Sequence, residues 1–148
     1  MNIKFHCKDD KYVSCDCSNL IKYSLYIQTI ADIIQEHESN ETQFLELSNV
    51  SSKTLDTILK ICNYELKIIT NIKQPLEDVI SKELYDIIDN LNDDERKDIL
   101  EATDFMCIES ISSIILAYYA YKMKSITIND IRKIVKIDED INQYMPWL

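Results

Sequence analysis

One histidine and three cysteines lie close together near the amino terminus, and imidazole and thiolate groups are common zinc ligands. These residues are His6, Cys7, Cys15 and Cys17. The spacing of Cys15 and Cys17 differs from the Cys-x-x-Cys pairs typical of zinc sites. Strand alternation also directs His6 away from Cys7. The three cysteines share a face with apolar neighbours, where free cysteine packs as a small hydrophobic residue. We therefore predict core cysteines and no metal site.

A cysteine nucleophile activated by histidine is the corresponding enzymatic hypothesis. The chain has two histidines, His6 on a predicted strand and His37 in an acidic segment. A catalytic cysteine needs a base and an electropositive environment, whereas Asp plus Glu number 26 and Lys plus Arg number 16. The carboxylates at 93–95 are predicted to occupy a helix amino terminus, where they complement the helix dipole. We therefore expect no enzymatic activity.

Three tyrosines provide the strongest signal for an interaction with another protein. Tyr118, Tyr119 and Tyr121 combine large apolar rings with polar tips, a property enriched at interfaces. The segment 114–119 is apolar around most of a helix, so this helix must be buried on more than one side. Either it lies at the centre of its own domain or it holds a partner.

The chain of 148 residues contains no glycine, although an average chain has about 7%. Phosphate-binding loops, dinucleotide fingerprints and nucleophile elbows all require glycine. Most nucleotide-dependent enzymes and common serine hydrolases are therefore disfavoured, and no cofactor is expected. Without glycine, the left-handed turn positions must be occupied by Asn and Asp. The chain also has only two prolines, and it is therefore predicted to be mainly helical.

The net charge and the hydropathy of the chain indicate which partners and which compartments to expect. The net charge of −10 disfavours nucleic acids and anionic membranes as partners. The longest apolar run, residues 114–121, is far shorter than the ~20 residues needed to span a bilayer. The amino terminus lacks the apolar core of a signal peptide. We expect a protein of the cytoplasm, the nucleus or both, with reduced thiols.

Hydrophobic periodicity predicts the elements that position these residues. Alternation over 3–7 and 12–17 predicts a hairpin, and 44–47 predicts a third strand. Helical spacing follows Ser18 over 21–34, and an acidic loop is expected at 35–41. The later apolar helical segments are residues 55–62, 76–91, 99–102, 111–119 and 128–135.

Signals at the helix ends complete this pattern. Asn92 and Glu95 form a predicted capping box, and a break is expected at 107–110. The helix at 127–136 is too short to be stable alone in water. It must dock on the rest of the domain or on a partner.

This order of elements, together with several short motifs, resembles the Skp family, the adaptors of Skp–cullin–F-box ubiquitin ligases. The sharpest motif is Thr127-Ile128-Asn129-Asp130-Ile131-Arg132-Lys133. The resemblance covers most of the chain outside 66–96, but the family's glycines are absent and the tail is shorter. The matching stretches are residues 2–5, 9–10, 22–30, 47–50 and 99–137.

The resemblance implies an α/β (α+β) architecture, with a BTB/POZ-type fold at 1–109 and a helical F-box-binding extension at 110–148. It implies a non-enzymatic adaptor that bridges an F-box substrate receptor to a cullin. The implied cullin contacts are Asp104 and Phe105, where the family usually has Asn and Tyr. The implied F-box contacts are Leu116, Tyr119, Met123, Ile131, Val135, Ile137 and Trp147.

Two alternatives remain within the adaptor class. The charge at Asp104 and the short tail favour a BTB-like homodimer or a decoy, which binds F-box proteins without recruiting cullin. A transcription-elongation adaptor like elongin C is the other alternative, but that family ends before the segment 127–137.

Overall fold

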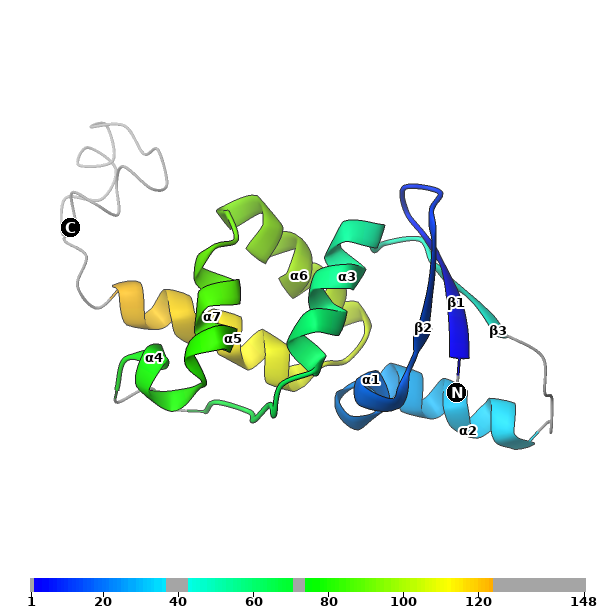
Figure 1. Cartoon of the computed structure of the whole chain (residues 1–148), viewed down its shortest axis with the longest axis horizontal. Coiled ribbons are helices and arrows are strands. Elements are labelled where there is room, and N and C mark those ends of the chain that lie inside the picture. Colours follow the sequence, from blue (N-terminus) through cyan, green and yellow to red (C-terminus); the bar gives the residue numbers. More distant parts are fainter. Residues whose placement is uncertain (1, 37–42, 71–73, 124–148) are drawn as a thin grey trace, which may run out of the picture.

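The computed structural model describes residues 2–36, 43–70 and 74–123. This part of the chain is a mixed α+β structure with one three-stranded sheet and seven helices (Figure 1). The sheet and the first two helices lie at one end of the molecule, and α4 to α7 lie at the other (Figure 1). None of the described helices is long and apolar enough to cross a membrane.

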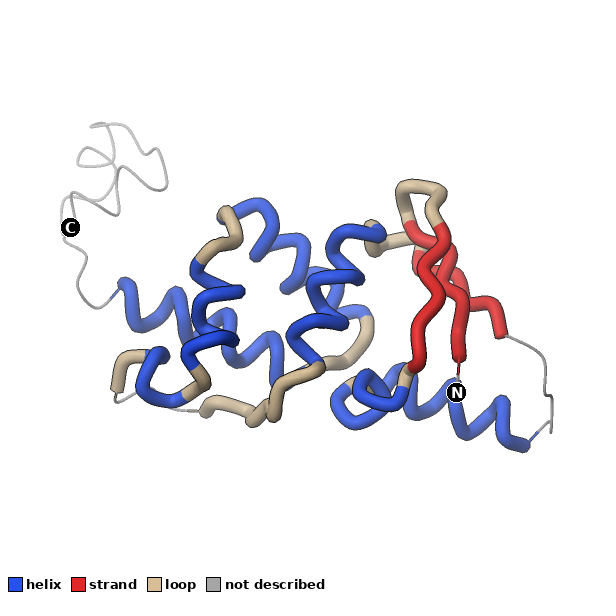
Figure 2. Tube along the Cα trace, in the orientation of Figure 1, coloured by secondary structure: helices blue, strands red, loops and turns tan. Residues whose placement is uncertain are grey.

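The sheet has the order β2–β1–β3, with β1 (Asn2–Cys7) in the centre (Figure 2). β2 (Tyr12–Asp16) pairs antiparallel to β1, and β3 (Gln43–Leu47) pairs parallel to it. Alternation buries Ile3, Phe5 and Cys7 on one face of β1. The predicted hairpin and third strand are confirmed.

The prediction of a single helix over 21–34 is wrong, because the structure has two helices there. α1 (Ser18–Tyr23) ends at Ser24, and α2 (Leu25–Glu36) begins immediately after it. The Ser24 hydroxyl donates to the Met106 carbonyl at 2.7 Å and accepts from the Ile27 backbone N–H at 3.2 Å. α2 also extends two residues into the predicted loop at 35–41, and residues 37–42 lie outside the described part.

The middle helices begin at serine caps. α3 (Ser52–Cys62) follows Ser51, whose hydroxyl accepts from the Thr54 backbone N–H. The helical pattern predicted over 76–91 is interrupted, since α4 (Leu76–Val79) ends before α5 (Lys82–Asp89) begins. Ser81 causes this break by capping α5 through its side chain.

The last two described helices pack against each other and run in roughly opposite directions, with a tight turn between them (Figure 1). α6 (Asp93–Phe105) begins with the predicted capping box, and both of its hydrogen bonds are present. Cys107 has φ = 55° and ends the turn before α7 (Glu109–Met123). The break predicted at 107–110 is confirmed in part, since it lies at 106–108 and Glu109 and Ser110 already belong to α7. The helix at 127–136 lies outside the described residues.

One continuous core joins the sheet to the helices. It includes Phe5 of β1, Ile58 of α3 and Ile99 of α6, all almost fully buried. It also includes residues from both sides of the expected boundary at 109/110, for example Ile108 and Ile111. Six of the 15 residues of α7 are buried within its own chain, so one face of the helix is packed against the domain. Its buried residues are Ser110, Ile111, Ile114, Ile115, Ala117 and Tyr118.

Candidate functional site

A buried arginine holds α7 in place. Arg96 of α6 is only 6% exposed, and its guanidinium donates to the backbone carbonyls of Ile88 and Asp89 at 3.0 and 2.9 Å. These carbonyls end α5, so Arg96 caps the carboxyl end of that helix. The same guanidinium lies over the Tyr118 ring, 4.6 Å from its centroid, and donates to the Tyr118 hydroxyl.

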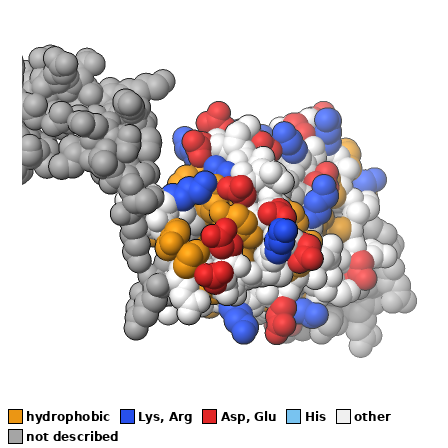
Figure 3. Space-filling view, turned by 60° about the vertical axis from the view of Figure 1, so that its left-hand side comes forward, with side chains coloured by type: hydrophobic (Ala, Val, Ile, Leu, Met, Phe, Trp, Pro, Cys, Tyr) orange, Lys and Arg blue, Asp and Glu red, His pale blue; other side chains and the backbone are white. Residues whose placement is uncertain are grey.

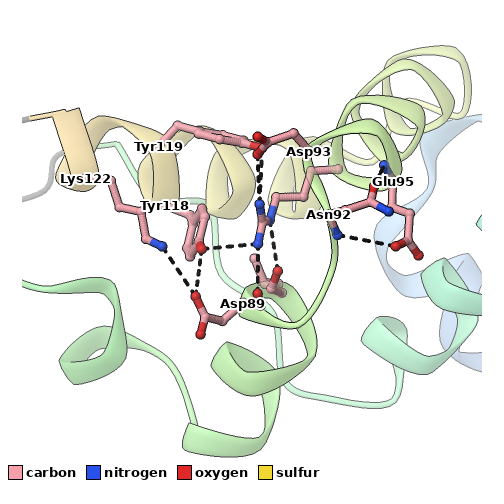
Figure 4. Close-up of polar contacts among 9 residues, drawn as sticks. Asp89, Asn92, Asp93, Glu95, Tyr118, Tyr119 and Lys122 are labelled. Atoms are coloured by element: carbon pink, nitrogen blue, oxygen red, sulfur yellow. Dashed lines mark hydrogen bonds and ion pairs between the residues drawn. The ribbon is translucent and has the colours of Figure 1, made fainter. Parts of the chain in front are cut away.

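Two tyrosines of α7 complete this network (Figure 4). The Tyr118 hydroxyl donates to Asp89 at 2.7 Å, and the Tyr119 hydroxyl donates to Asp93 at 2.8 Å. Donation from Tyr118 lowers the pKa of Asp89, and Lys122 contributes a further hydrogen bond in the same direction. Burial raises the pKa of Tyr119. Both tyrosines therefore anchor α7 to the ends of α5 and α6.

This network corrects the interpretation of the three tyrosines as one interaction surface. Tyr118 is 3% exposed and is internal, whereas Tyr119 is half-buried and Tyr121 is 36% exposed. The sequence analysis did not single out Arg96. A usable signal was present, because the chain has 14 Lys and 2 Arg. In such a chain an arginine marks a position that needs several donors in one plane.

Beyond this network, α7 exposes large apolar side chains. Leu116, Tyr121 and Met123 are exposed, and we call them the α7 surface. Leu116 and Met123 are 58% and 56% exposed, and they are seven residues apart, so they lie on the same side of the helix. Figure 3 shows hydrophobic side chains gathered on this side of the molecule, with acidic and basic side chains among them.

A small depression of ≈ 120 Å³ adjoins the α7 surface. Tyr121 and Lys122 of α7 line one side of it, and Pro75, Leu76 and Glu77 at the start of α4 line the other. An apolar side chain of a partner could enter here, because the depression lies between two helices and contains aromatic and aliphatic walls.

Asp104 and Phe105 lie at the end of α6, and both are exposed. The Phe105 ring packs against Tyr26 of α2 with 5.2 Å between ring centroids. Both residues line a wide depression of ≈ 430 Å³, to which Glu101 of α6 and Lys8 also contribute. This surface is separate from the α7 surface and carries two carboxylates.

Four of the expected F-box contacts, Ile131, Val135, Ile137 and Trp147, lie outside the described residues. Of the other three, Leu116 and Met123 belong to the α7 surface. Tyr119 lies beside them on the same helix, with its hydroxyl already bonded to Asp93. The structure therefore leaves the two aliphatic side chains available to a partner.

In the described part of the chain, the structure does not bring the His6 ring together with the cysteines considered for chemistry. Cys7 and Cys17 are buried, as predicted, and Cys15 is half-buried beside them. The His6 ring faces the other way and bonds to Asp10 at 2.6 Å and Glu46 at 2.9 Å. Within the described residues, no three His, Cys, Asp or Glu side chains are grouped so that they could hold a metal ion.

No family model matches this chain, and no curated protein matches it in sequence. Its class must therefore be inferred from the fold and the exposed surfaces.

Proposed function

We propose that this protein is an adaptor that binds two other proteins, an F-box substrate receptor and a cullin, as in Skp–cullin–F-box ubiquitin ligases. The observation that carries the proposal is the α7 surface. A helix otherwise packed into the core leaves Leu116 and Met123 in contact with water. The two side chains are 58% and 56% exposed, so a partner that covers them gains about 2–3 kcal/mol of hydrophobic driving force.

The architecture supports the same proposal. The proposed BTB/POZ-type fold rests on an element order of a hairpin, a helical segment, a third strand and then helices only. The described chain has β1 and β2 antiparallel, α1 and α2 next, and β3 parallel to β1. From α3 to α7 only helices follow. The order of elements is therefore compatible with this fold.

The first test measures F-box binding by isothermal titration calorimetry with the full chain and a panel of F-box domains. The variants Leu116→Asp and Met123→Asp place a charge on the α7 surface, which has to be desolvated on binding. We expect each variant to weaken binding at least about tenfold, which corresponds to ~1.4 kcal/mol. Ile33→Asp on α2 is the matched control, because Ile33 is also apolar and 50% exposed but lies at the other end of the molecule.

Two results would contradict the proposal. One is that no F-box domain in the panel binds the unmodified chain. The other is that Ile33→Asp weakens binding as much as Leu116→Asp and Met123→Asp, which would show that the α7 surface is not the contact.

A decoy that binds F-box proteins without a cullin is the second candidate function. It is favoured by the acidic character of the depression around Asp104, to which Glu101 adds a second carboxylate. A pull-down with a cullin amino-terminal domain separates the two functions. If the unmodified chain fails to bind but Asp104→Asn combined with Phe105→Tyr binds, the decoy is supported. Binding by the unmodified chain supports the adaptor.

A further inference from the structure

Two cysteines meet where the sheet passes into the first helix. Cys15 is near the end of β2, and Cys17 is the residue that precedes α1. Cys17 belongs to the hydrophobic core, and Cys15 is partly buried against it. Their sulfur atoms are 3.5 Å apart, close to van der Waals contact. The described structure holds them as free thiols.

The two thiols differ in accessibility and in acidity. Cys15 lines an open depression of ≈ 360 Å³, together with Asn19 and Lys60, whereas Cys17 is 0% exposed. The hydrogen bond between the two thiols lowers the pKa of Cys15. The pKa of Cys17 is raised by this same interaction and by burial. Cys15 is therefore the nucleophile, and Cys17 is the protonated thiol behind it.

We propose that Cys15 and Cys17 form a site of reversible oxidation, in which a hydroperoxide oxidises Cys15 and Cys17 closes a disulfide. In the first step the Cys15 thiolate attacks the outer oxygen of the peroxide, and the O–O bond breaks. The released alkoxide or hydroxide takes a proton, and Cys15 becomes a sulfenic acid. In the second step the Cys17 sulfur attacks the Cys15 sulfur. Hydroxide leaves and combines with the Cys17 proton as water.

The local structure permits this bond. A disulfide brings the sulfur atoms to about 2.05 Å, so they must approach by roughly 1.5 Å from the present 3.5 Å. Cys17 makes no side-chain cap bond to α1, so its sulfur can move without breaking one. The remaining hydrogen bond of the Cys17 thiol, to the Cys15 carbonyl, is long at 3.9 Å.

The surroundings of Cys15 select the oxidant. Asp16 and Asp56 line the same depression, and both disfavour the thiolate through their charge. The same charges repel oxidised glutathione, which is anionic, but not hydrogen peroxide, which is neutral. We therefore expect hydrogen peroxide to be the more effective oxidant at equal concentration.

Peptide mapping of the full chain tests the proposal directly. Trypsin cuts after Lys11 and Lys22, so residues 12–22 form one peptide with only these two cysteines. After peroxide treatment, alkylation and digestion, we expect this peptide to be two hydrogens lighter and to carry no alkyl group. Prior reduction with dithiothreitol should restore two alkyl groups. Oxidised glutathione should give at least about threefold less of the bond.

The other cysteines provide internal controls on separate tryptic peptides. Cys7 and Cys62 are buried, and burial raises the pKa of Cys62 to about 12. The folded chain is oxidised first and is then denatured and labelled. Both thiols should still react fully with the alkylating agent. Cys107 is exposed but has no second cysteine beside it in the described structure, so it should give no intrachain bond.

Two variants assign the roles of the pair. In Cys17→Ala, the sulfenic acid of Cys15 should persist and be trapped by dimedone. In Cys15→Ala, Cys17 should remain reduced under the same conditions. The proposal is overturned if both thiols of the unmodified chain stay alkylatable while Cys107 is oxidised. It is equally overturned if Cys17 is oxidised as fast in Cys15→Ala as in the unmodified chain.

Discussion

Arg96 illustrates how one side chain can connect three helices. Its ion pair with Asp93 contributes little, because the Asp93 side chain is 85% exposed and solvent screens the attraction. The bonds to the carbonyls of Ile88 and Asp89 contribute more, since a hydrogen bond from a charged donor is worth about 1.5–3 kcal/mol. The arginine therefore stabilises this junction mainly through its several donors and its flat shape.

We predict that Arg96→Met destabilises the fold by about 2–4 kcal/mol, because two carbonyl acceptors and two phenol groups lose their donor. Arg96→Lys should recover only part of this loss, since one ammonium cannot reach all the acceptors. Urea unfolding measures the free energy of both variants. Lys97→Met, at an exposed neighbouring position, should stay within about 0.5 kcal/mol of the unmodified chain. Equal stability of Arg96→Met and Lys97→Met would refute this role.

His6 is the second residue with a structural role that its neighbours define. Its ring stacks on Tyr12 at 4.7 Å, and its two nitrogens face Asp10 and Glu46. Lys4 is a further charge near the Tyr12 ring. A neutral imidazole can donate to only one carboxylate, whereas the imidazolium donates to both. The bond to Asp10, followed by that to Glu46, raises the pKa of His6 above 6.5.

This raised pKa predicts a pH dependence of definite sign. The stabilisation from His6 is fully present below its unfolded pKa of 6.5 and is lost as pH rises through the higher folded value. The stability difference between the unmodified chain and His6→Gln should therefore be larger near pH 5 than near pH 8. Urea unfolding of both proteins at the two pH values measures it. A difference that is constant, or larger near pH 8, would contradict the prediction.

At the scale of elements, the sequence predicted those helices and strands whose signals are local. Alternation identified β1, β2 and β3, and the pair Asn92 and Glu95 identified the start of α6. The breaks at Ser24 and Ser81 were missed, because apolar spacing continues through both positions. The Ser24 break depends on the Met106 carbonyl, 82 residues away in sequence, and no local pattern reports such a partner.

The candidate site also contains residues that the sequence could indicate and residues that it could not. The family resemblance named Leu116 and Met123 as F-box contacts; their side chains are exposed, and the role itself stays a prediction. The burial of Tyr118 could not be predicted from the sequence, since its partners Arg96 and Asp89 come from other helices. A tyrosine at an interface and a tyrosine inside a polar network have the same spacing along a helix.

Ser24→Ala tests whether the break between α1 and α2 is held from a distance. The variant removes the donor to Met106 and the cap of the Ile27 N–H, so we predict a loss of about 1–3 kcal/mol. Thr29→Ala is the matched control, because its hydroxyl donates only to the Leu25 carbonyl four residues earlier and is exposed. Thermal unfolding compares them. Equal effects would show that the long-range bond contributes nothing.

At the scale of the whole molecule, one exposed surface precedes the amino end of α7 and the other lies along the carboxyl half of that helix. Asp104 and Phe105 immediately precede the turn into α7, whereas Met123 is its last residue. α7 has 15 residues and is therefore about 20 Å long. Its buried residues run from Ser110 to Tyr118, so this part of the helix is held against the core and acts as a spacer between the surfaces. An adaptor with this geometry can hold two proteins at once without contact between them.

This separation predicts that the two binding events are independent. Substitutions farther apart than about 10 Å, with no shared partners, have additive effects. Met123→Asp should weaken F-box binding and leave cullin affinity within about twofold, and Asp104→Lys should change cullin affinity alone. The double variant should show the sum of the two free-energy changes. Calorimetry measures the affinity for each of the two partners, first alone and then with the other partner already bound, which gives four affinities. Coupling above about 1 kcal/mol would mean that both partners contact a shared surface, and the picture of α7 as a spacer would then be wrong.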